Sequence, residues 1–216
     1  SLQKICFDKN LGYGCDKITL NAKEKIKLHL NCPEAEIHFL VGGTQTNSIV
    51  IDSLLKKYES VISVDIGHIT DHEAGAIEAK GHKIVMLKNH DGKMHTKDLI
   101  NYLATFNADK NNAHMVRPGM VYISFPTEYG TIYTIEELKE LRQICDENNL
   151  ILYMDGARLG YGIAASMDVT LKDIAKYCHA FYIGGTKIGA MFGEALVFTK
   201  KNLCPHFFTL IKQGGA

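Results

Sequence analysis

Four short segments of the 216-residue chain combine glycines with side chains able to do chemistry. In the first, Gly43, Thr44 and Gln45 stand between an apolar run and a helical pattern. Glycines let backbone N–H groups approach an anion, and the start of a helix adds unpaired N–H groups and the positive end of a dipole. The segment predicts a phosphate-binding turn. The alternative is an ordinary strand–helix turn with a Thr N-cap.

The second segment places Asp155 at the end of an apolar run and Arg158 three residues later. A carboxylate at the end of a buried strand needs a cationic partner. Arg158 is one candidate for that partner. The other is a protonated nitrogen of a ligand, which would leave the planar guanidinium of Arg158 free for a carboxylate or a phosphate.

The third segment surrounds Lys187 with glycine, Thr186 and apolar residues, unlike most lysines of the chain. A lysine amine shielded from water can form a Schiff base with a carbonyl compound. The alternative is a solvated surface lysine.

The fourth segment holds His68, His72 and Glu73 after another apolar run. Their spacing does not match HExxH, so no metal site is predicted. A single His could serve as an aromatic platform or a proton carrier, and the alternative is a structural His.

These segments follow elements that alternate along the chain. Continuous apolar runs such as VYISF and LILYM are typical of strands covered on both faces. Strand–helix alternation predicts a mostly parallel α/β sheet of about seven strands between helices, with ligands at the carboxyl ends of the strands. The predicted strands are Ile37–Val41, Ser60–Val64, Lys83–Leu87, Val121–Phe125, Leu150–Asp155, Ala180–Gly184 and Ala195–Thr199, and the predicted helices are Thr46–Tyr58, Thr96–Phe106 and Ile135–Asn148.

Composition narrows the class of protein. Lys plus Arg and Asp plus Glu each number 24, so no nucleic acid or anionic membrane is expected as a partner. No apolar run approaches the roughly 20 residues that span a bilayer, and the first residues lack an apolar signal core. The six cysteines form no CxxC pair, which favours reduced thiols and a cytoplasmic location.

A phosphate turn, a buried Asp, a shielded Lys and a flat His together are the parts that pyridoxal 5'-phosphate (PLP) requires. At this point the chain resembles the threonine aldolase and β-eliminating lyase group of fold type I, aspartate aminotransferase-like PLP enzymes. The matching motifs are GYGCD (12–16), HFLVGGTQTN (38–47), GHITDHEAGA (67–76), YMDGARLG (153–160) and GGTKIG (184–189).

The resemblance assigns a role to each matching position. It implies that Gly43, Thr44 and Gln45 form a phosphate loop. It implies that His68 stacks on the pyridine ring, with the acid Glu73 five residues later, and that Asp155 is the pyridinium partner. It further implies that Arg158 lies near phosphate or substrate carboxylate and that Lys187, beside Thr186, is the Schiff-base lysine.

Two departures from the family pattern stand out. Glu128 occupies the place where threonine aldolases usually carry a second active-site histidine, so the base that takes the substrate hydroxyl proton is Glu128, His68 or a water. The chain is also shorter than family members, and we expect an N-terminal helical segment (1–35), a PLP-binding large domain (36–200) and the start of a connection (201–216) to a missing small C-terminal domain.

The expected function is PLP-dependent cleavage of the Cα–Cβ bond of a β-hydroxy amino acid, giving glycine and an aldehyde. The alternatives are another PLP amino-acid enzyme, such as an aminotransferase or a β-eliminating lyase, and a truncated non-catalytic protein of this fold. The resemblance further implies a small amino-acid substrate and a homodimer or homotetramer.

Overall fold

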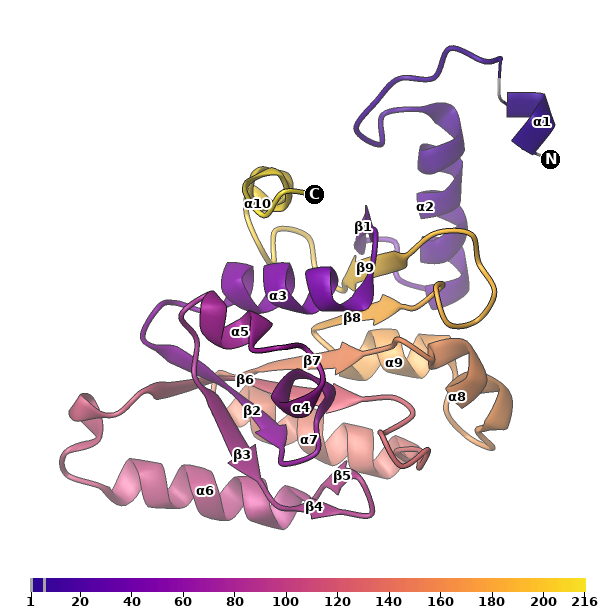
Figure 1. The fold of residues 1–216 in the computed structure, drawn as a ribbon. Helices are drawn as coiled ribbons and strands as arrows, with labels where there is room; N and C mark the ends of the chain where they lie inside the picture. The colour runs from indigo at the N-terminus through magenta and orange to yellow at the C-terminus, as the bar shows by residue number, and fades with distance from the viewer. Residues whose placement is uncertain (1, 6) are drawn as a thin grey trace.

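A seven-stranded sheet forms the centre of the molecule (Figure 1). The structure is a computed structural model and describes residues 2–5 and 7–216. The strand order is β1-β9-β8-β7-β6-β2-β3, and only β9 runs antiparallel to its two neighbours. The strands are β1 (Glu36–Leu40), β2 (Glu59–Val64), β3 (Ile84–Leu87), β6 (Arg117–Ser124), β7 (Ile151–Asp155), β8 (Ala180–Ile183) and β9 (Glu194–Phe198), and a separate hairpin joins β4 (Asn89–His90) to β5 (Lys93–Met94).

This sheet confirms the predicted fold class and all seven predicted strands, with ends that differ by up to four residues. The largest difference is at β6, which begins at Arg117 rather than Val121. Pro118 and Gly119 conceal this start in the sequence, because both residues are unfavourable inside a strand. The register between β2 and β6 shifts between Ser60 and Val61, beside the place where Pro118 pairs with Ser60.

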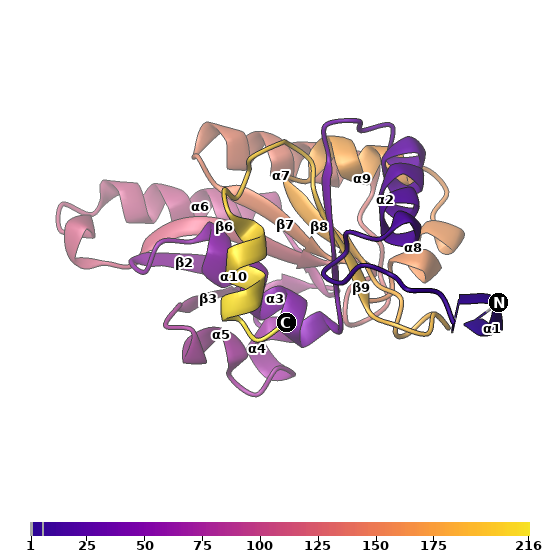
Figure 2. The same ribbon diagram turned by 90° about the horizontal axis from the view of Figure 1, so that it is seen from above.

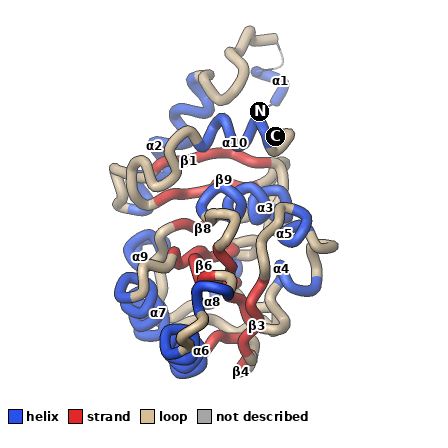
Figure 3. The backbone as a smooth tube through the Cα atoms, turned by 90° about the vertical axis from the view of Figure 1, so that its left-hand side faces the viewer, coloured by secondary structure: helices blue, strands red, loops and turns tan. Residues whose placement is uncertain are grey.

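Helices cover both faces of the sheet (Figures 1 and 3). One apolar cluster joins the sheet to residues of α2, α6, α7 and α9, and a second joins it to α3, α4, α5 and α10. The helices are α1 (Leu2–Ile5), α2 (Lys17–Leu30), α3 (Gly43–Leu54), α4 (His68–Asp71), α5 (Ala76–Ala79), α6 (Thr96–Ala108), α7 (Ile135–Glu147), α8 (Leu159–Ala165), α9 (Leu171–Tyr177) and α10 (Phe207–Gln213), with a 3₁₀ turn at Asn112–His114. Figure 2 shows α10 beside α3.

Local signals explain where the helices begin. Thr134 and Glu137 form a capping box at the start of α7, in which each side chain accepts a hydrogen bond from the other residue's backbone N–H. The predicted start of α3 at Thr46 is wrong, because the helix begins at Gly43 with Gly42 as the N-cap. The Gly-Gly pair disfavours helix by propensity and so reads as a turn in the sequence. No helix in the described part of the chain combines the length and apolar character needed to cross a membrane.

Candidate functional site

The segments singled out in the sequence meet at one edge of the sheet. Five strands point in the same direction, so their carboxyl ends share that edge. They are β1, β2, β6, β7 and β8. Asp155 is the last residue of β7, and the residues that follow the other four strands include Gly43, His68, Glu128 and Lys187. This is where open α/β sheets bind ligands.

Asp155 is buried at the centre of this edge and accepts four hydrogen bonds. The hydroxyl of Tyr182 (2.5 Å) and the backbone N–H of Ala157 (2.9 Å) donate to Oδ1. The hydroxyl of Tyr122 (2.6 Å) and the Nδ2 of Asn47 (2.9 Å) donate to Oδ2. These donors are neutral, and they fix the carboxylate in one orientation without neutralising its charge.

The sequence left open whether Arg158 neutralises Asp155, and the structure shows that it does not. Among the described residues, no Lys, Arg or His nitrogen lies within 4.0 Å of the Asp155 carboxylate. Arg158 is exposed at the start of α8, and its guanidinium forms no hydrogen bond or ion pair within the part of the chain that the structure describes. Arg158 is therefore available to an anionic ligand.

Asn47 links Asp155 to a second buried carboxyl group. Its Nδ2 also donates to Oε1 of Glu73 at 2.7 Å, and its Oδ1 accepts from the hydroxyl of Tyr153 at 2.8 Å. Burial raises the pKa of Glu73 to about 7, and the charge of Asp155 acts in the same direction. Asn47 lies within the TQTN motif, but its double donation depends on tertiary contacts that the sequence does not reveal.

His68 lies within reach of the charges of the other predicted site residues. Burial lowers the pKa of its imidazole, Asp155 raises it, and the positive charges of Lys187 and Arg158 lower it further. The structure thus brings these four side chains together. The ring is half-buried and lies 5.6 Å from the ring of His72, at an interplanar angle of 42°.

Glu128 ties the end of β6 to the start of α4. Its Oε1 accepts from the backbone N–H of His68 at 3.0 Å and from the hydroxyl of Ser124 at 2.6 Å. Burial raises the pKa of the Glu128 carboxyl, and Asp155 adds to that effect. Glu128 forms no ion pair with Arg158 among the described residues.

The predicted phosphate turn is the first turn of α3. Gly42 caps the helix without a side-chain hydrogen bond, so the backbone N–H groups that follow have no side-chain acceptor at the cap. Thr44 is exposed, whereas the Oε1 of Gln45 accepts from the backbone N–H of Val41 at 3.2 Å. A Cβ added to Gly43 would lie 3.0 Å from the hydroxyl of Tyr182, so glycine allows the turn to approach the Asp155 cluster closely.

Lys187 is exposed, which corrects the prediction of a lysine shielded by its neighbours. It lies on the loop between β8 and β9, and this loop leaves its side chain on the open edge of the sheet. The loop is anchored by Glu194, which sequence reasoning missed: Oε2 accepts from the backbone N–H of Gly185 at 3.1 Å and Oε1 from the hydroxyl of Thr186 at 2.9 Å. The signal that could have identified Glu194 is a lone acid opening the apolar run EALVF.

Glycines bring the Asp155 and Lys187 segments into backbone contact. The N–H of Gly184 donates to the carbonyl of Gly156 at 2.9 Å. A Cβ on Gly156 would lie 1.8 Å from the carbonyl oxygen of Tyr182, and one on Gly184 would lie 2.4 Å from that of Ala157. Any larger residue at either position would push the two segments apart.

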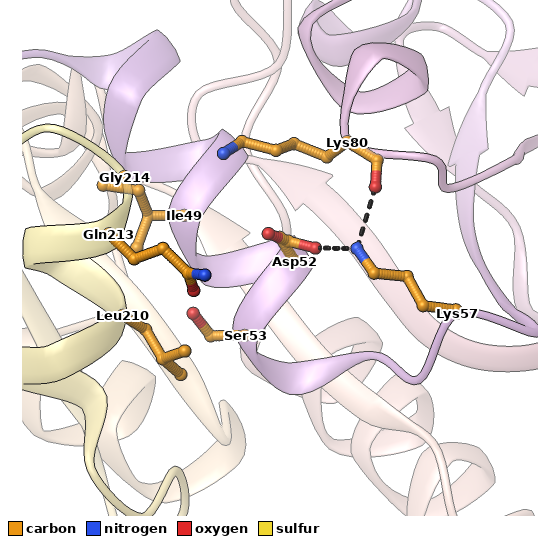
Figure 4. A pocket seen from close by; sticks show the side chains of 8 residues that line it. All are labelled: Ile49, Asp52, Ser53, Lys57, Lys80, Leu210, Gln213 and Gly214. Carbon is orange, nitrogen blue, oxygen red and sulfur yellow. Dashed lines mark hydrogen bonds and ion pairs between the residues drawn. The ribbon is translucent and has the colours of Figure 1, made fainter.

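A separate hollow of about 350 Å³ lies between α3 and α10 (Figure 4). Within it Asp52 accepts from the ammonium of Lys57 at 2.6 Å, and that ammonium also donates to the carbonyl of Lys80. Asp52 and Lys57 pair with each other there, and the sequence motifs at the carboxyl ends of the strands contribute no side chain to this hollow, so the Asp155 cluster is the candidate site.

The residues at the sheet edge fit PLP. Asp155 has neutral donors but no cation, which suits a protonated ring nitrogen. The start of α3 and the guanidinium of Arg158 suit a phosphate or a carboxylate, and the exposed amine of Lys187 suits a carbonyl group.

The fold and this site define an α/β protein with a site built for an anionic aromatic aldehyde. The model of the beta-eliminating lyase family matches residues 8–215. The chain belongs to the beta-eliminating lyase family, whose lyases and threonine aldolases are PLP-dependent enzymes.

Similar proteins support this assignment. The low specificity L-threonine aldolase of Pseudomonas sp. (strain NCIMB 10558) is 32% identical over all of this chain, which covers 62% of that protein. The solved Leishmania major threonine aldolase is 44% identical, with a TM-score of 0.94, over 100% of this chain and 62% of its own. A putative L-allo-threonine aldolase from Listeria monocytogenes, at 20% identity and a TM-score of 0.75, covers 97% of this chain and 56% of its own and shares the fold. The chain thus spans about three-fifths of the length of the first two proteins.

Proposed function

We propose that this protein is a PLP-dependent lyase that cleaves the Cα–Cβ bond of a β-hydroxy amino acid and yields glycine and an aldehyde. The observation that carries the proposal is the Asp155 carboxylate, which is buried, held by four neutral donors and without a cationic partner in the described chain. When bound, PLP supplies an electron sink for the Cα of an amino acid.

Each residue has a part in this proposal. Lys187 carries the cofactor, and Asp155 keeps the ring nitrogen protonated. Gly43, Thr44 and Gln45 receive the phosphate at the start of α3. The imidazole of His68 would support the ring of the bound cofactor. Thr186, beside Lys187, and Arg158 are further cofactor contacts in this proposal. The guanidinium of Arg158 also suits the substrate carboxylate.

The proton of the substrate hydroxyl needs an acceptor, and Glu128 is one candidate. Burial and nearby negative charge raise the pKa of its carboxyl, which strengthens it as a base relative to an exposed Glu. His68 and a water are the other candidates. Glu128 also holds the backbone of His68, so a change at position 128 can act on both.

Residues 36–200 form the cofactor-binding domain in this proposal, and residues 1–35 form an N-terminal helical segment. The proposal also includes assembly as a homodimer or homotetramer and a cytoplasmic location. The described cysteines, at positions 15, 32, 145, 178 and 204, are free thiols, as a reducing compartment favours.

Product analysis tests the proposal. The protein is supplied with PLP and, separately, with L-threonine, L-allo-threonine and L-serine. Glycine released in equal amount to an aldehyde supports the lyase. A keto acid with amino-group transfer would instead indicate an aminotransferase, and ammonia with a keto acid would indicate β-elimination. Cofactor binding with no product from any substrate would indicate the non-catalytic alternative.

A further inference from the structure

The Glu73 carboxyl group is buried, yet only one of its oxygens has a partner. Glu73 is 4% exposed, its Oε1 accepts from Asn47, and its Oε2 forms no hydrogen bond with any described residue. A buried ionised carboxylate with a bare oxygen is costly, whereas a protonated carboxyl group carries no charge there. The geometry favours a proton on Glu73.

Asn47 couples this carboxyl group to Asp155. The two hydrogens of one amide nitrogen are divided between Glu73 Oε1 and Asp155 Oδ2, at 2.7 and 2.9 Å. The hydroxyl of Tyr153 donates to the Oδ1 of Asn47 and fixes which end of the amide faces the two acids. A change of charge on Glu73 therefore acts on an amide that directly contacts Asp155.

The surroundings of Glu73 contain few charges. Asp155 and Tyr153 face it from β7, Asn47 and Thr44 from α3, and Lys187 from the loop after β8. Burial raises the pKa of Glu73 to about 7 and the charge of Asp155 adds to this, whereas the hydrogen bond from Asn47 and the charge of Lys187 oppose it. The carboxyl group can therefore change its charge near neutral pH.

From this geometry we infer that Glu73 is a positioning residue that acts on Asp155 through Asn47, neutral at low pH and anionic at high pH. Two linked carboxyl groups, rather than one, then set the charge that faces the ring nitrogen. The action on the cofactor rests on the proposed function, whereas the proton on Glu73 does not.

The first arm of the test uses the cofactor-free protein and the variant Glu73→Gln, which keeps the shape and an acceptor oxygen but cannot ionise. An acid whose pKa is raised in the folded state binds protons that the unfolded chain releases, so its ionisation lowers stability as pH rises from about 4.5 to about 7. We expect urea unfolding to show Glu73→Gln gaining stability over the wild type between pH 5 and pH 8. The folding equilibrium gains up to roughly a hundredfold, since one pKa unit corresponds to a factor of about ten. Glu78→Gln, at an exposed position on α5, should show no such gain.

The second arm uses the PLP-loaded proteins. An anion at position 73 favours a positively charged chromophore, so Glu73→Gln should lower the apparent pKa of the visible absorption band by roughly one, about a tenfold change in proton affinity. A purely structural Glu73 would leave the band unmoved, because Gln retains the acceptor for Asn47. Glu78→Gln again serves as the control.

The outcomes separate the two claims. Equal pH dependence of stability in wild type and Glu73→Gln would overturn the proton on Glu73. A gain in stability with an unmoved band would overturn its action on the cofactor site. A wild type that forms no visible band with PLP would refute the proposed function and with it that action, while the unfolding data would still decide the proton.

Discussion

Asp155 meets neutral donors on both oxygens, and this arrangement determines what its replacement does. Asp155→Asn keeps one acceptor oxygen and the shape but loses the charge, whereas Asp155→Ala leaves the hydroxyls of Tyr122 and Tyr182 unpaired in a buried place. We expect both variants to lower kcat/KM for aldehyde release by roughly a hundredfold or more, because the ring nitrogen loses its anionic partner. PLP affinity should fall less than turnover.

Steady-state kinetics and a PLP titration of each variant check this expectation. Asp71→Asn, at an exposed position on α4, is the matched control and should behave as the wild type. Turnover of Asp155→Asn within about threefold of the wild type would contradict the role of Asp155.

Replacing Glu128 should separate turnover from PLP binding. Glu128→Gln retains a side-chain oxygen for the N–H of His68 and the hydroxyl of Ser124, but it removes the carboxylate that is one candidate for the base. Turnover should fall while PLP binding is kept. The pKa of Glu128 is raised, so the loss of wild-type turnover on acidification should begin at a higher pH than it would with an ordinary Glu as the base. Glu128→Gln should lose this pH dependence.

Glu128→His completes the series, and it should shift preference toward threonine over other β-hydroxy amino acids. The measurement is kcat/KM for each substrate in all three proteins, with the exposed Glu136→Gln as control. The same substrate ranking throughout would show that Glu128 is structural and does not set specificity.

Among the elements, the loop between β8 and β9 depends on one side chain. Glu194 holds both the backbone of Gly185 and the hydroxyl of Thr186, next to Lys187. Glu194→Ala should therefore increase amide hydrogen exchange in residues 185–193 and weaken PLP binding, although Lys187 itself is intact. Mass spectrometry of exchanged peptides and a PLP titration measure both effects. Unchanged exchange in that loop would show that Glu194 does not anchor it, and Glu136→Ala is the control.

The elements themselves were largely predictable from the sequence. Strand β7 is apolar up to its last residue, Asp155, because both faces of the sheet are covered. Thr134 with Glu137 marks the start of α7. The contacts across elements were not predictable. The link from Asn47 to Asp155 spans 108 positions, and the freedom of Arg158 depends on where α8 begins. The exposure of Lys187 likewise follows from the path of a loop, which local composition does not determine.

For the molecule as a whole, the order of strands makes the site. The chain passes from β1 at one edge of the sheet to β2 and β3 at the other, and then returns through β6, β7, β8 and β9. This path places β7 in the middle of the sheet (Figure 1). Asp155 ends that central strand, near the loops that follow the carboxyl ends of its neighbours. Segments more than a hundred residues apart therefore meet at one site.

The most direct test of this account is the place where PLP becomes attached. The protein is loaded with PLP, reduced with borohydride and digested, and the peptides are mapped by mass spectrometry. We expect a pyridoxyl group on Lys187 in the wild type and none in Lys187→Ala. The variant Lys139→Ala, at an exposed position, should be labelled at Lys187 as in the wild type. A pyridoxyl group on a different lysine, or on none, would contradict the account.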